Sequence, residues 1–291
     1  MYEQIASNKR KSWIIMATFI VVIVGMGYVF DQALQAGYSL FIIAIIFAIF
    51  SSFTSYYFSD SISIAMSGAK EVSKSNEVRL YRIVENLSIA TGITPPPKVY
   101  VIEDMAINAF ATGRDPNHAA VAVTRGALVK LEDLELEGVI AHEMSHIKNY
   151  DIRTMAIAVV LVGIIAMAGE LFIRSQFFRG GDRKEGNGLM MVFAIIGAIL
   201  APLMAQLLKM ALSRQREFLA DASAVNITRY PEGLARALEK IAGDPDPLDH
   251  ANSATAHLYI SNPLKKRGEK ISNMFSTHPP IEERIARLRS M

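Results

Sequence analysis

Long uncharged stretches of apolar residues alternate with polar sequence along this chain. A helix needs about 20 such residues to cross roughly 30 Å of hydrocarbon. The sequence therefore predicts four membrane-spanning helices. The third and fourth are the more polar pair, so they are also compatible with packing against protein or lining a cavity. The four segments are Trp13–Phe30, Tyr38–Phe58, Thr154–Ile173 and Gly188–Leu208.

Basic residues flank the first two segments on one side only. Lys9, Arg10 and Lys11 precede the first segment and further basic residues follow the second, whereas the intervening loop of residues 31–37 has none. Lys and Arg concentrate on the cytoplasmic side of membrane helices. We therefore expect both termini to face the cytoplasm, although the basic loop at residues 174–184 runs against this orientation. The first apolar run is too long for a signal peptide, so we expect an uncleaved anchor.

Two polar segments, residues 59–151 and 213–291, lie outside the apolar ones. We expect them to be the two halves of one metalloprotease domain, as the motifs below indicate. Residues 1–58 and 152–212 would form two membrane hairpins. Hydrophobic spacing and β-rich runs predict the following elements: a helix over 76–90, a small sheet or hairpin around 98–102 and 119–124, and a helix over 132–150.

Composition narrows the chemistry that the polar segments can carry. The chain is 51% hydrophobic and 20% charged, and it contains no cysteine. Disulfides, thiolate metal sites, cysteine nucleophiles and thioether lipid anchors are therefore excluded. The formal net charge of +2 comes without a long basic block, so we expect no nucleic-acid partner. No nucleotide-binding motif is evident, so we also expect no nucleotide partner.

The predicted helix over 132–150 contains the sequence His142-Glu143-Met144-Ser145-His146. Residues four apart lie on one face of a helix, so both imidazoles can reach a single zinc ion. Glu143 lies beside the first histidine and can accept a proton from a water molecule. Only six histidines are present, and two of them have this spacing around a glutamate. The pattern therefore indicates a catalytic metal site and not a chance match on a solvated helix.

A catalytic zinc site usually has three protein ligands. The extended zincin pattern is absent, because Asn149 and Ile152 stand where it has a glycine and a third histidine. Glu217 is the best candidate for a third ligand, because it lies four residues before Asp221 and the two carboxylates therefore share one helical face. Two apolar segments separate His146 from Glu217, and this even number of spans returns the chain to the same side of the membrane. On spacing alone, this carboxylate pair is equally compatible with a solvated acidic face among neighbouring arginines.

Three sequence elements then occur in a recognisable order: the HExxH motif at 142–146, Glu217-x-x-x-Asp221 and Thr277-His278-Pro279-Pro280. Two apolar segments precede the first element, and an apolar hairpin separates the first from the second. In this combination the whole chain resembles the HtpX and CAAX prenyl endopeptidase family of membrane-bound gluzincin metalloproteases. The resemblance implies that one zinc ion per subunit is bound by His142, His146 and Glu217, with Glu143 as the general base.

The same resemblance implies roles for four further residues. Asp221 would orient a ligand histidine, Arg284 would form an ion pair near the site, and His278 would lie near the metal as an oxyanion or substrate donor. Asn108 would lie at the edge that binds substrate. Without the resemblance, His278 is better explained as the entry to a helix that begins after two prolines, and Asn108 is nearly as well explained by turn geometry.

The expected fold is mainly α with a small β-sheet, in a multi-span membrane protein with a cytoplasmic zincin-like metalloprotease domain. The resemblance implies proteolytic quality control, in which misfolded or damaged membrane proteins are cleaved at the cytoplasmic face of a bacterial inner membrane. The expected partners are such polypeptides, unfolded chains and the lipid bilayer. Whether residues 244–275 cover the active site stays open.

Two alternatives from other functional classes remain. A CAAX-type prenyl protease shares the motifs but normally has more than four spans. A transporter or scaffold could keep its histidines for a structural metal site, but it has no need of a glutamate between them. An intramembrane protease is disfavoured because charged residues surround the HExxH motif.

Overall fold

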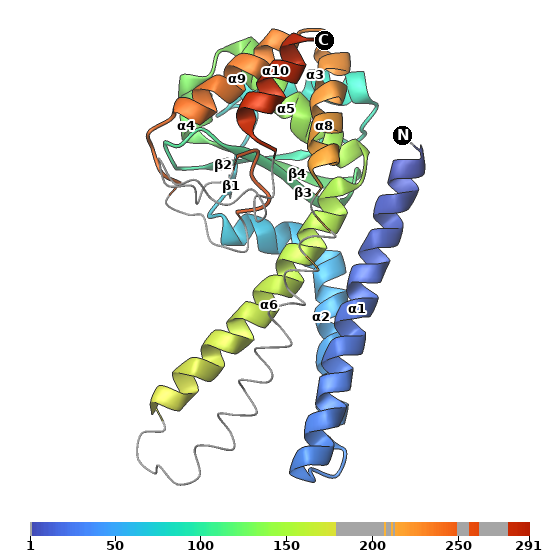
Figure 1. Ribbon diagram of the computed structural model, residues 1–291. Coiled ribbons are helices and arrows are strands. Elements are labelled where there is room, and N and C mark those ends of the chain that lie inside the picture. Colours follow the sequence, from blue (N-terminus) through green and yellow to red (C-terminus); the bar gives the residue numbers. More distant parts are fainter. Residues whose placement is uncertain (1, 179–206, 208–210, 212, 249–255, 262–278) are drawn as a thin grey trace.

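The computed structural model describes residues 2–178, 207, 211, 213–248, 256–261 and 279–291. Helices cover a small sheet in one part of the molecule, and three long helices extend from it in the same general direction (Figure 1). The structure is therefore mainly helical with one small mixed sheet, as the sequence predicts.

The first two long helices, α1 (Tyr2–Leu34) and α2 (Ser39–Met66), form an antiparallel hairpin. The carboxylate of Asp31 accepts hydrogen bonds from the backbone N–H groups of Tyr38 at 2.8 Å and Leu40 at 3.0 Å. These bonds satisfy N–H groups at the start of α2 that have no partner within the helix. Both helices are longer than the apolar segments that the sequence predicts, because they continue into polar sequence beside the domain.

The hairpin carries apolar side chains on its outer surface, which is the arrangement expected of helices in lipid. Its inner face is different: serines recur along α2 and pack inward. Small residues allow helices to approach closely in a membrane, and Ser55 Oγ donates to the carbonyl of Ile157 at 3.1 Å. The outward apolar residues include Trp13, Val21, Val29, Ile42, Ile46 and Phe50.

Within the described part of the chain, α1 and α2 are long and apolar enough to cross a membrane, and a third span exists only if the bent pair α5 (Asp133–Lys148) and α6 (Asp151–Phe178) counts as one. The third predicted segment lies within α6 (Asp151–Phe178). Residues 151–162 at the start of this helix are buried against protein. The fourth predicted segment, 188–208, lies outside the described residues except for Leu207, which is buried together with residues of α1 and α6.

The sheet has four strands in the order β1-β2-β4-β3. The central pair β2–β4 is parallel, and the two outer pairs are antiparallel. β3 therefore lies at one edge of the sheet. The two strands predicted from the sequence are confirmed as β2 and β4, whose bounds agree to within one residue. The strands are β1 (Lys70–Glu71), β2 (Lys98–Ile102), β3 (Ala109–Asp115) and β4 (His118–Thr124).

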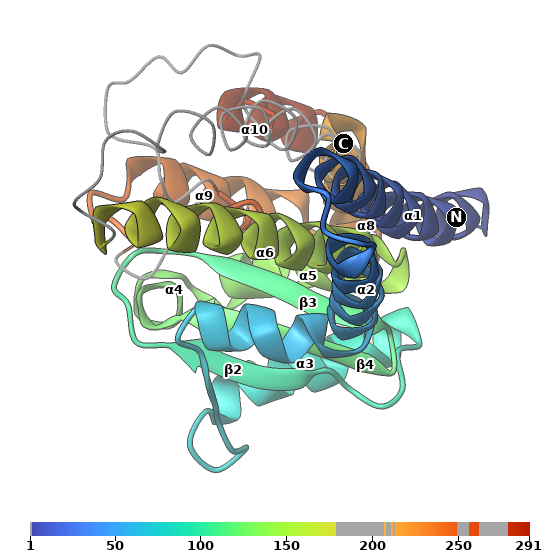
Figure 2. The same cartoon turned by 90° about the horizontal axis from the view of Figure 1, so that it is seen from below.

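Side chains alternate between the two faces of the sheet, as the two-residue period of a strand requires. On one face, Val121, Val123 and Ala111 pack against the helices of the domain core. On the other face, Phe110 and Ala122 pack with the start of α6 and the end of α2. Figure 2, seen from below, shows α2 and α6 in front of the sheet. The sheet thus separates the membrane helices from the core helices.

The core side is built around α5 (Asp133–Lys148), which is buried along most of its length. The described helices of the second polar segment pack onto α5, so that the two polar segments contribute to one core. Gly138 of α5 allows a close approach to α9, since a Cβ atom there would lie 2.7 Å from the backbone nitrogen of Leu234. The other core helices are α3 (Val78–Thr91), α4 (Arg125–Lys130), α8 (Arg214–Thr228), α9 (Pro231–Gly243) and α10 (Ile281–Arg289).

The helix predicted over 132–150 ends earlier than expected, at Lys148. Tyr150 has a left-handed backbone conformation with φ of 60°. A residue in this conformation cannot continue a right-handed helix, so the chain turns by 83° into α6. The turn places Asp151, the first residue of α6, beside the last turns of α5.

Candidate metal centre

Two histidines of α5 and one glutamate of α8 converge in the core. His142 Nε2 lies 3.6 Å from a carboxylate oxygen of Glu217, and His146 Nε2 lies 3.6 Å from the other oxygen. The two Nε2 atoms are 3.2 Å apart. All three side chains are buried, and their ligand-type atoms lie within 4.8 Å of one another. The structure thus brings together the histidine pair and the carboxylate that the sequence singles out.

The outer ring nitrogens of both histidines contact carboxylates. His142 Nδ1 lies 2.9 Å from Asp221 Oδ1, and His146 Nδ1 lies 3.1 Å from Asp151 Oδ2. An ionised carboxylate only accepts, so each Nδ1 carries the hydrogen and each Nε2 of a neutral imidazole presents a lone pair. Two lone pairs and a carboxylate that face one another at these distances fit a divalent cation. The donor set therefore fits a metal with nitrogen and oxygen ligands.

Arg284 of α10 holds the carboxylate behind His142. Its Nε donates to Asp221 Oδ2 at 2.9 Å and its Nη2 donates to Asp221 Oδ1 at 2.7 Å. Its Nη1 donates to the carbonyl of Ile260 at 3.2 Å and lies 3.8 Å from Glu217. Arg284 is 1% exposed, so the guanidinium is fully inside the core. It therefore fixes the carboxylate that orients His142, and it does not reach solvent.

Burial and charge shift the pKa of several of these groups. Burial tends to lower the pKa of His142, but hydrogen bonding to Asp221 and Glu217 outweighs burial and raises this pKa to about 9. For Asp221, burial tends to raise the pKa, but Arg284 and His142 together lower it to about 2. Burial tends to lower the pKa of Arg284, but the charge and hydrogen bonding of Asp221, together with the charges of Glu217 and Glu143, outweigh burial and raise this pKa.

Glu143 lies in the core with 2% of its surface exposed. Burial is the main cause of its raised pKa, and the charge of nearby Glu217 adds to it, while the two histidines and a hydrogen bond from the backbone of Ala111 oppose the increase. A carboxylate whose pKa is raised is a better proton acceptor, which is the property of a general base. Glu143 is thus placed between the histidine pair and strand β3.

The outer edge of β3 is paired with a short segment of the chain itself. The backbone N–H of Ile260 donates to the carbonyl of Ala109 at 3.0 Å. The Asn108 side chain donates through Nδ2 to the carbonyl of Ser261 at 3.1 Å. Next to these bonds, the ring of Tyr259 packs edge-on against that of Phe110. The edge of β3 beside Glu143 therefore offers the carbonyl of Ala109 and the side-chain amide of Asn108 to the backbone of a neighbouring segment.

His278 lies outside the described residues. The structure adds three residues that the sequence analysis did not assign: Asp151, Asn8 and Arg216. The carboxylate of Asp151 accepts a hydrogen bond from His146, and it also accepts hydrogen bonds from Asn8 and Arg216. The sequence signal for Asp151 is its position five residues after His146. The bend at Tyr150 brings Asp151 back to His146, and no periodic pattern in the sequence predicts such a bend.

Comparison with known proteins assigns the chain to a family. The model of peptidase family M48 matches residues 74–291. The chain belongs to peptidase family M48. The match begins before α3 and extends to the end of the chain, so it contains both histidines, Glu217 and Arg284. Membership in M48 and the apolar hairpin α1–α2 make the protein a membrane metalloprotease.

Relatives within M48 extend the similarity over the full length. The chain is 48% identical over 290 residues to a "Protease HtpX homolog" of Dictyoglomus thermophilum, which covers 100% of this chain and 94% of the relative. Proteins with the same name from Tropheryma whipplei and Streptococcus gordonii are each 45% identical and cover 100% of this chain, with 98% and 100% of the relatives covered. These alignments therefore include the residues of the first apolar hairpin.

A solved structure is also similar at a lower level. The crystal structure of S. mikatae Ste24p aligns with a TM-score of 0.49 and 17% sequence identity, covering 97% of this chain and 67% of that one. The M48 assignment rests on the sequence matches alone.

Proposed function

We propose that this M48 protein is a zinc-dependent endopeptidase that binds one zinc ion per subunit through His142, His146 and Glu217. One observation carries the proposal: the two Nε2 atoms and the Glu217 carboxylate face one another in the core beside buried Glu143. Neither a transporter nor a scaffold explains a buried glutamate at that position.

Glu143 is the general base of the proposed reaction. Zinc bound to these ligands supplies Lewis-acid chemistry that polarises a peptide carbonyl and lowers the pKa of a water molecule. Glu143 takes the proton of the attacking water and donates it to the leaving amine. Its burial excludes bulk water, and the raised pKa suits a group that must first accept a proton and then release it. We include His278 as an oxyanion or substrate donor.

The edge of β3 supports binding of an extended substrate. Ala109 and Asn108 bind the backbone of residues 260 and 261 through groups that are not specific for any side chain. A polypeptide substrate can pair with the same groups by adding a strand to the sheet edge. We therefore propose Asn108 as a substrate-binding residue, and Asp221 with Arg284 as the groups that orient His142.

The substrates we propose are misfolded or damaged proteins of a bacterial cytoplasmic membrane, cleaved at its cytoplasmic face. Two observations support this choice. Helix α6 starts just after the HExxH helix and extends from the domain in the same general direction as the hairpin α1–α2 (Figure 1), and Asn8 of α1 contacts Asp151 at its start, so the site lies close to the apolar helices. The basic residues before the first apolar segment favour a cytoplasmic position for the N-terminus.

The mechanism is tested with the full-length protein purified in detergent. Glu143→Gln keeps the size of the side chain but removes its basicity, so we expect unchanged zinc content and a loss of casein cleavage of about 10²–10⁴-fold. His142→Ala should lose both zinc and cleavage. Glu137→Gln, which changes another glutamate of the same helix, is the matched control and should behave as the unchanged protein. Casein cleavage retained by Glu143→Gln would refute the mechanism.

The substrate class needs a separate experiment. A membrane protein that has been made unstable by mutation and the same protein in its stable form are reconstituted with the protease in liposomes, together with a farnesylated CAAX peptide as a third substrate. Preferential cleavage of the unstable form supports quality control. Cleavage of the farnesylated peptide alone would instead favour a prenyl protease.

A further inference from the structure

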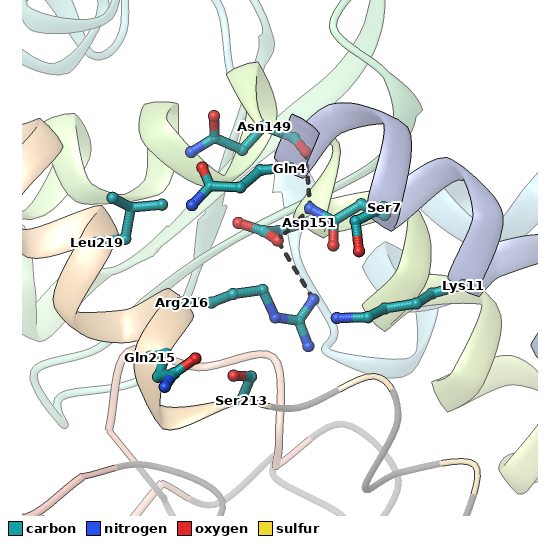
Figure 3. Close-up of a pocket in the computed structure, with 10 residues that line it drawn as sticks. Gln4, Ser7, Lys11, Asn149, Asp151, Ser213, Gln215, Arg216 and Leu219 are labelled. Carbon is teal, nitrogen blue, oxygen red and sulfur yellow. Dashed lines mark hydrogen bonds and ion pairs between the residues drawn. The ribbon is translucent and has the colours of Figure 1, made fainter. Parts of the chain in front are cut away.

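The carboxylate of Asp151 is shared by three side chains from three helices. His146 Nδ1 lies 3.1 Å from Oδ2, while Asn8 Nδ2 donates to Oδ1 at 2.7 Å and Arg216 Nη1 donates to Oδ1 at 3.2 Å. Figure 3 shows Arg216 reaching Asp151 from α8, with a dashed line between them. Asp151 is 2% exposed. Its orientation is therefore set by these protein contacts and hardly by water.

Asn8 belongs to the membrane helix α1, far from the other partners in sequence. Its Nδ2 also donates to the carbonyl of Asn149 at 2.9 Å, in the turn between α5 and α6. The amide is 3% exposed, so both of its hydrogens are committed to this turn. Asn8 thus holds the turn and the carboxylate at the same time. The bond to Asp151 is also the shortest of those that fix this carboxylate.

A second set of contacts fixes this part of α1 in place without involving Asp151. Ser12 Oγ lies 3.1 Å from Thr154 Oγ1, and Thr154 Oγ1 donates to the carbonyl of Asn8 at 3.1 Å. Both hydroxyl groups are fully buried. Docking of α1 onto α6 and orientation of Asp151 therefore depend on different side chains, so variants can separate the two effects.

We propose that Asn8 is a positioning residue of the metal site, which acts through Asp151 to fix the ring of His146. This inference rests on the proposed function, because it assumes that His146 is a metal ligand. It assigns to α1 a role beyond membrane anchoring, since α1 supplies a side chain that holds the metal-binding helix in its competent arrangement.

The expected size of the effect follows from the chain of contacts. Without Asn8, the remaining partner of the Oδ1 atom among the described residues is Arg216, whose bond at 3.2 Å is longer. The carboxylate is then free to turn toward Arg216 and away from His146. Loss of a group that orients a metal-binding histidine typically costs 10–100-fold in metal affinity.

A cavity beside Asp151 determines which substitution is most informative. The cavity has a volume of about 150 Å³ and is lined by polar residues that include Gln4, Ser7, Lys11 and Ser213 (Figure 3). Water can enter from it and replace a truncated side chain. Asn8→Leu removes both amide hydrogens but keeps the same number and branching of heavy atoms, with larger terminal groups, so it excludes that water. Asn8→Ala is the second variant and should have a smaller effect.

The experiment measures zinc affinity in the full-length protein by competition with a chromophoric chelator. We expect Asn8→Leu to weaken zinc binding by about 10-fold, the lower end of the range for a group that contacts the histidine directly, and Asn8→Ala by a smaller factor. Gln4→Leu is the matched control, because it makes the same change one turn earlier beside the same cavity. Ser12→Ala tests docking of α1 alone. Both controls should change the affinity by less than about 2-fold, since neither residue contacts Asp151 in the described structure.

A cobalt-substituted sample supplies a readout that does not depend on activity. The visible absorption of bound Co²⁺ reports ligand geometry, so it should change in Asn8→Leu and not in Gln4→Leu. If Asn8→Leu retains both zinc affinity and the cobalt spectrum, the inference is wrong. If Ser12→Ala weakens zinc binding as much as Asn8→Leu does, general docking explains the effect and the inference is also wrong. If His146→Ala retains zinc affinity, the proposed ligand set fails first.

Discussion

Replacement of Arg284 by leucine tests how much of the domain's stability depends on one buried ion pair. Leucine removes the two bonds to Asp221, at 2.9 and 2.7 Å, and the bond to the carbonyl of Ile260. Asp221 would remain in the core with 2% of its surface exposed, without the guanidinium and with the imidazole of His142 as its remaining partner among the described residues. Breaking a buried pair by removing one partner typically costs about 3–5 kcal/mol.

This free energy converts into a shift in Tm that is easy to measure. A domain of 150–250 residues loses roughly 2–4 °C of Tm for each kcal/mol, so we expect a decrease of about 6–20 °C for Arg284→Leu. The assay is thermal unfolding of the metal-free full-length protein in detergent, followed by circular dichroism. Arg287→Leu is the matched control on the same helix. It removes an exposed pair with Glu283 and should lower Tm much less.

A double substitution decides whether the ion pair is the cause. Arg284→Leu combined with Asp221→Leu removes both charges, and apolar replacement of a whole buried pair is often neutral or stabilising. The double variant should therefore unfold at a higher temperature than Arg284→Leu alone. A double variant whose Tm loss equals the sum of the two single losses would show that Arg284 and Asp221 act independently, and the reasoning would fail.

Three further predictions concern the substrate edge, the acid limit and helix packing. Asn108→Ala removes one hydrogen bond to the substrate backbone, so KM should increase by about 2–10-fold with little change in kcat, as steady-state kinetics can show. The pKa of Asp221 is lowered to about 2 in the folded protein. The ionised carboxylate therefore stabilises the fold above about pH 4, and this stabilisation is lost as the pH falls through about 2. Acid titration of the metal-free protein should show a smaller loss of folding free energy between these pH values for Arg284→Leu than for the unchanged protein. Gly138→Ala places a Cβ atom 2.7 Å from the backbone nitrogen of Leu234 and should destabilise the fold by about 1–3 kcal/mol in chemical unfolding, whereas Gly163→Ala, with open space around it, should not.

Local periodicity is the reason that much of the fold is predictable from the sequence. The apolar spacing of residues 76–90 predicts α3, the β-rich runs predict β2 and β4, and the apolar segments predict α1 and α2. The HExxH pair is equally local, because four residues of helix fix the relation between two side chains. Each of these features depends only on neighbours in the chain.

The parts of the site that the sequence does not reveal depend on contacts between distant segments. Asp151 reaches His146 because Tyr150 adopts a left-handed conformation, and a single such residue leaves no repeat to detect. Asn8 reaches Asp151 because α1 packs beside α6. The pairing of residue 260 with the edge of β3 also joins positions far apart in the chain. Glu217 lies between these cases: its spacing to Asp221 is visible, but only the fold places it opposite the histidines.

The arrangement of these contacts supports the metal centre from both ends of the chain. His142 is held through Asp221 by Arg284, near the end of the chain, and His146 is held through Asp151 by Asn8, near its beginning. The orientation of His142 thus depends on the domain core, whereas the orientation of His146 depends on the docking of the membrane helix α1. Since α6 starts at Asp151 and continues into the apolar region, a shift of α1 against α6 moves the group that orients His146. Zinc affinity should consequently respond to the packing of the membrane helices, and a chain that lacks α1 would keep Glu217 and both histidines but lose one of the two supports that align them.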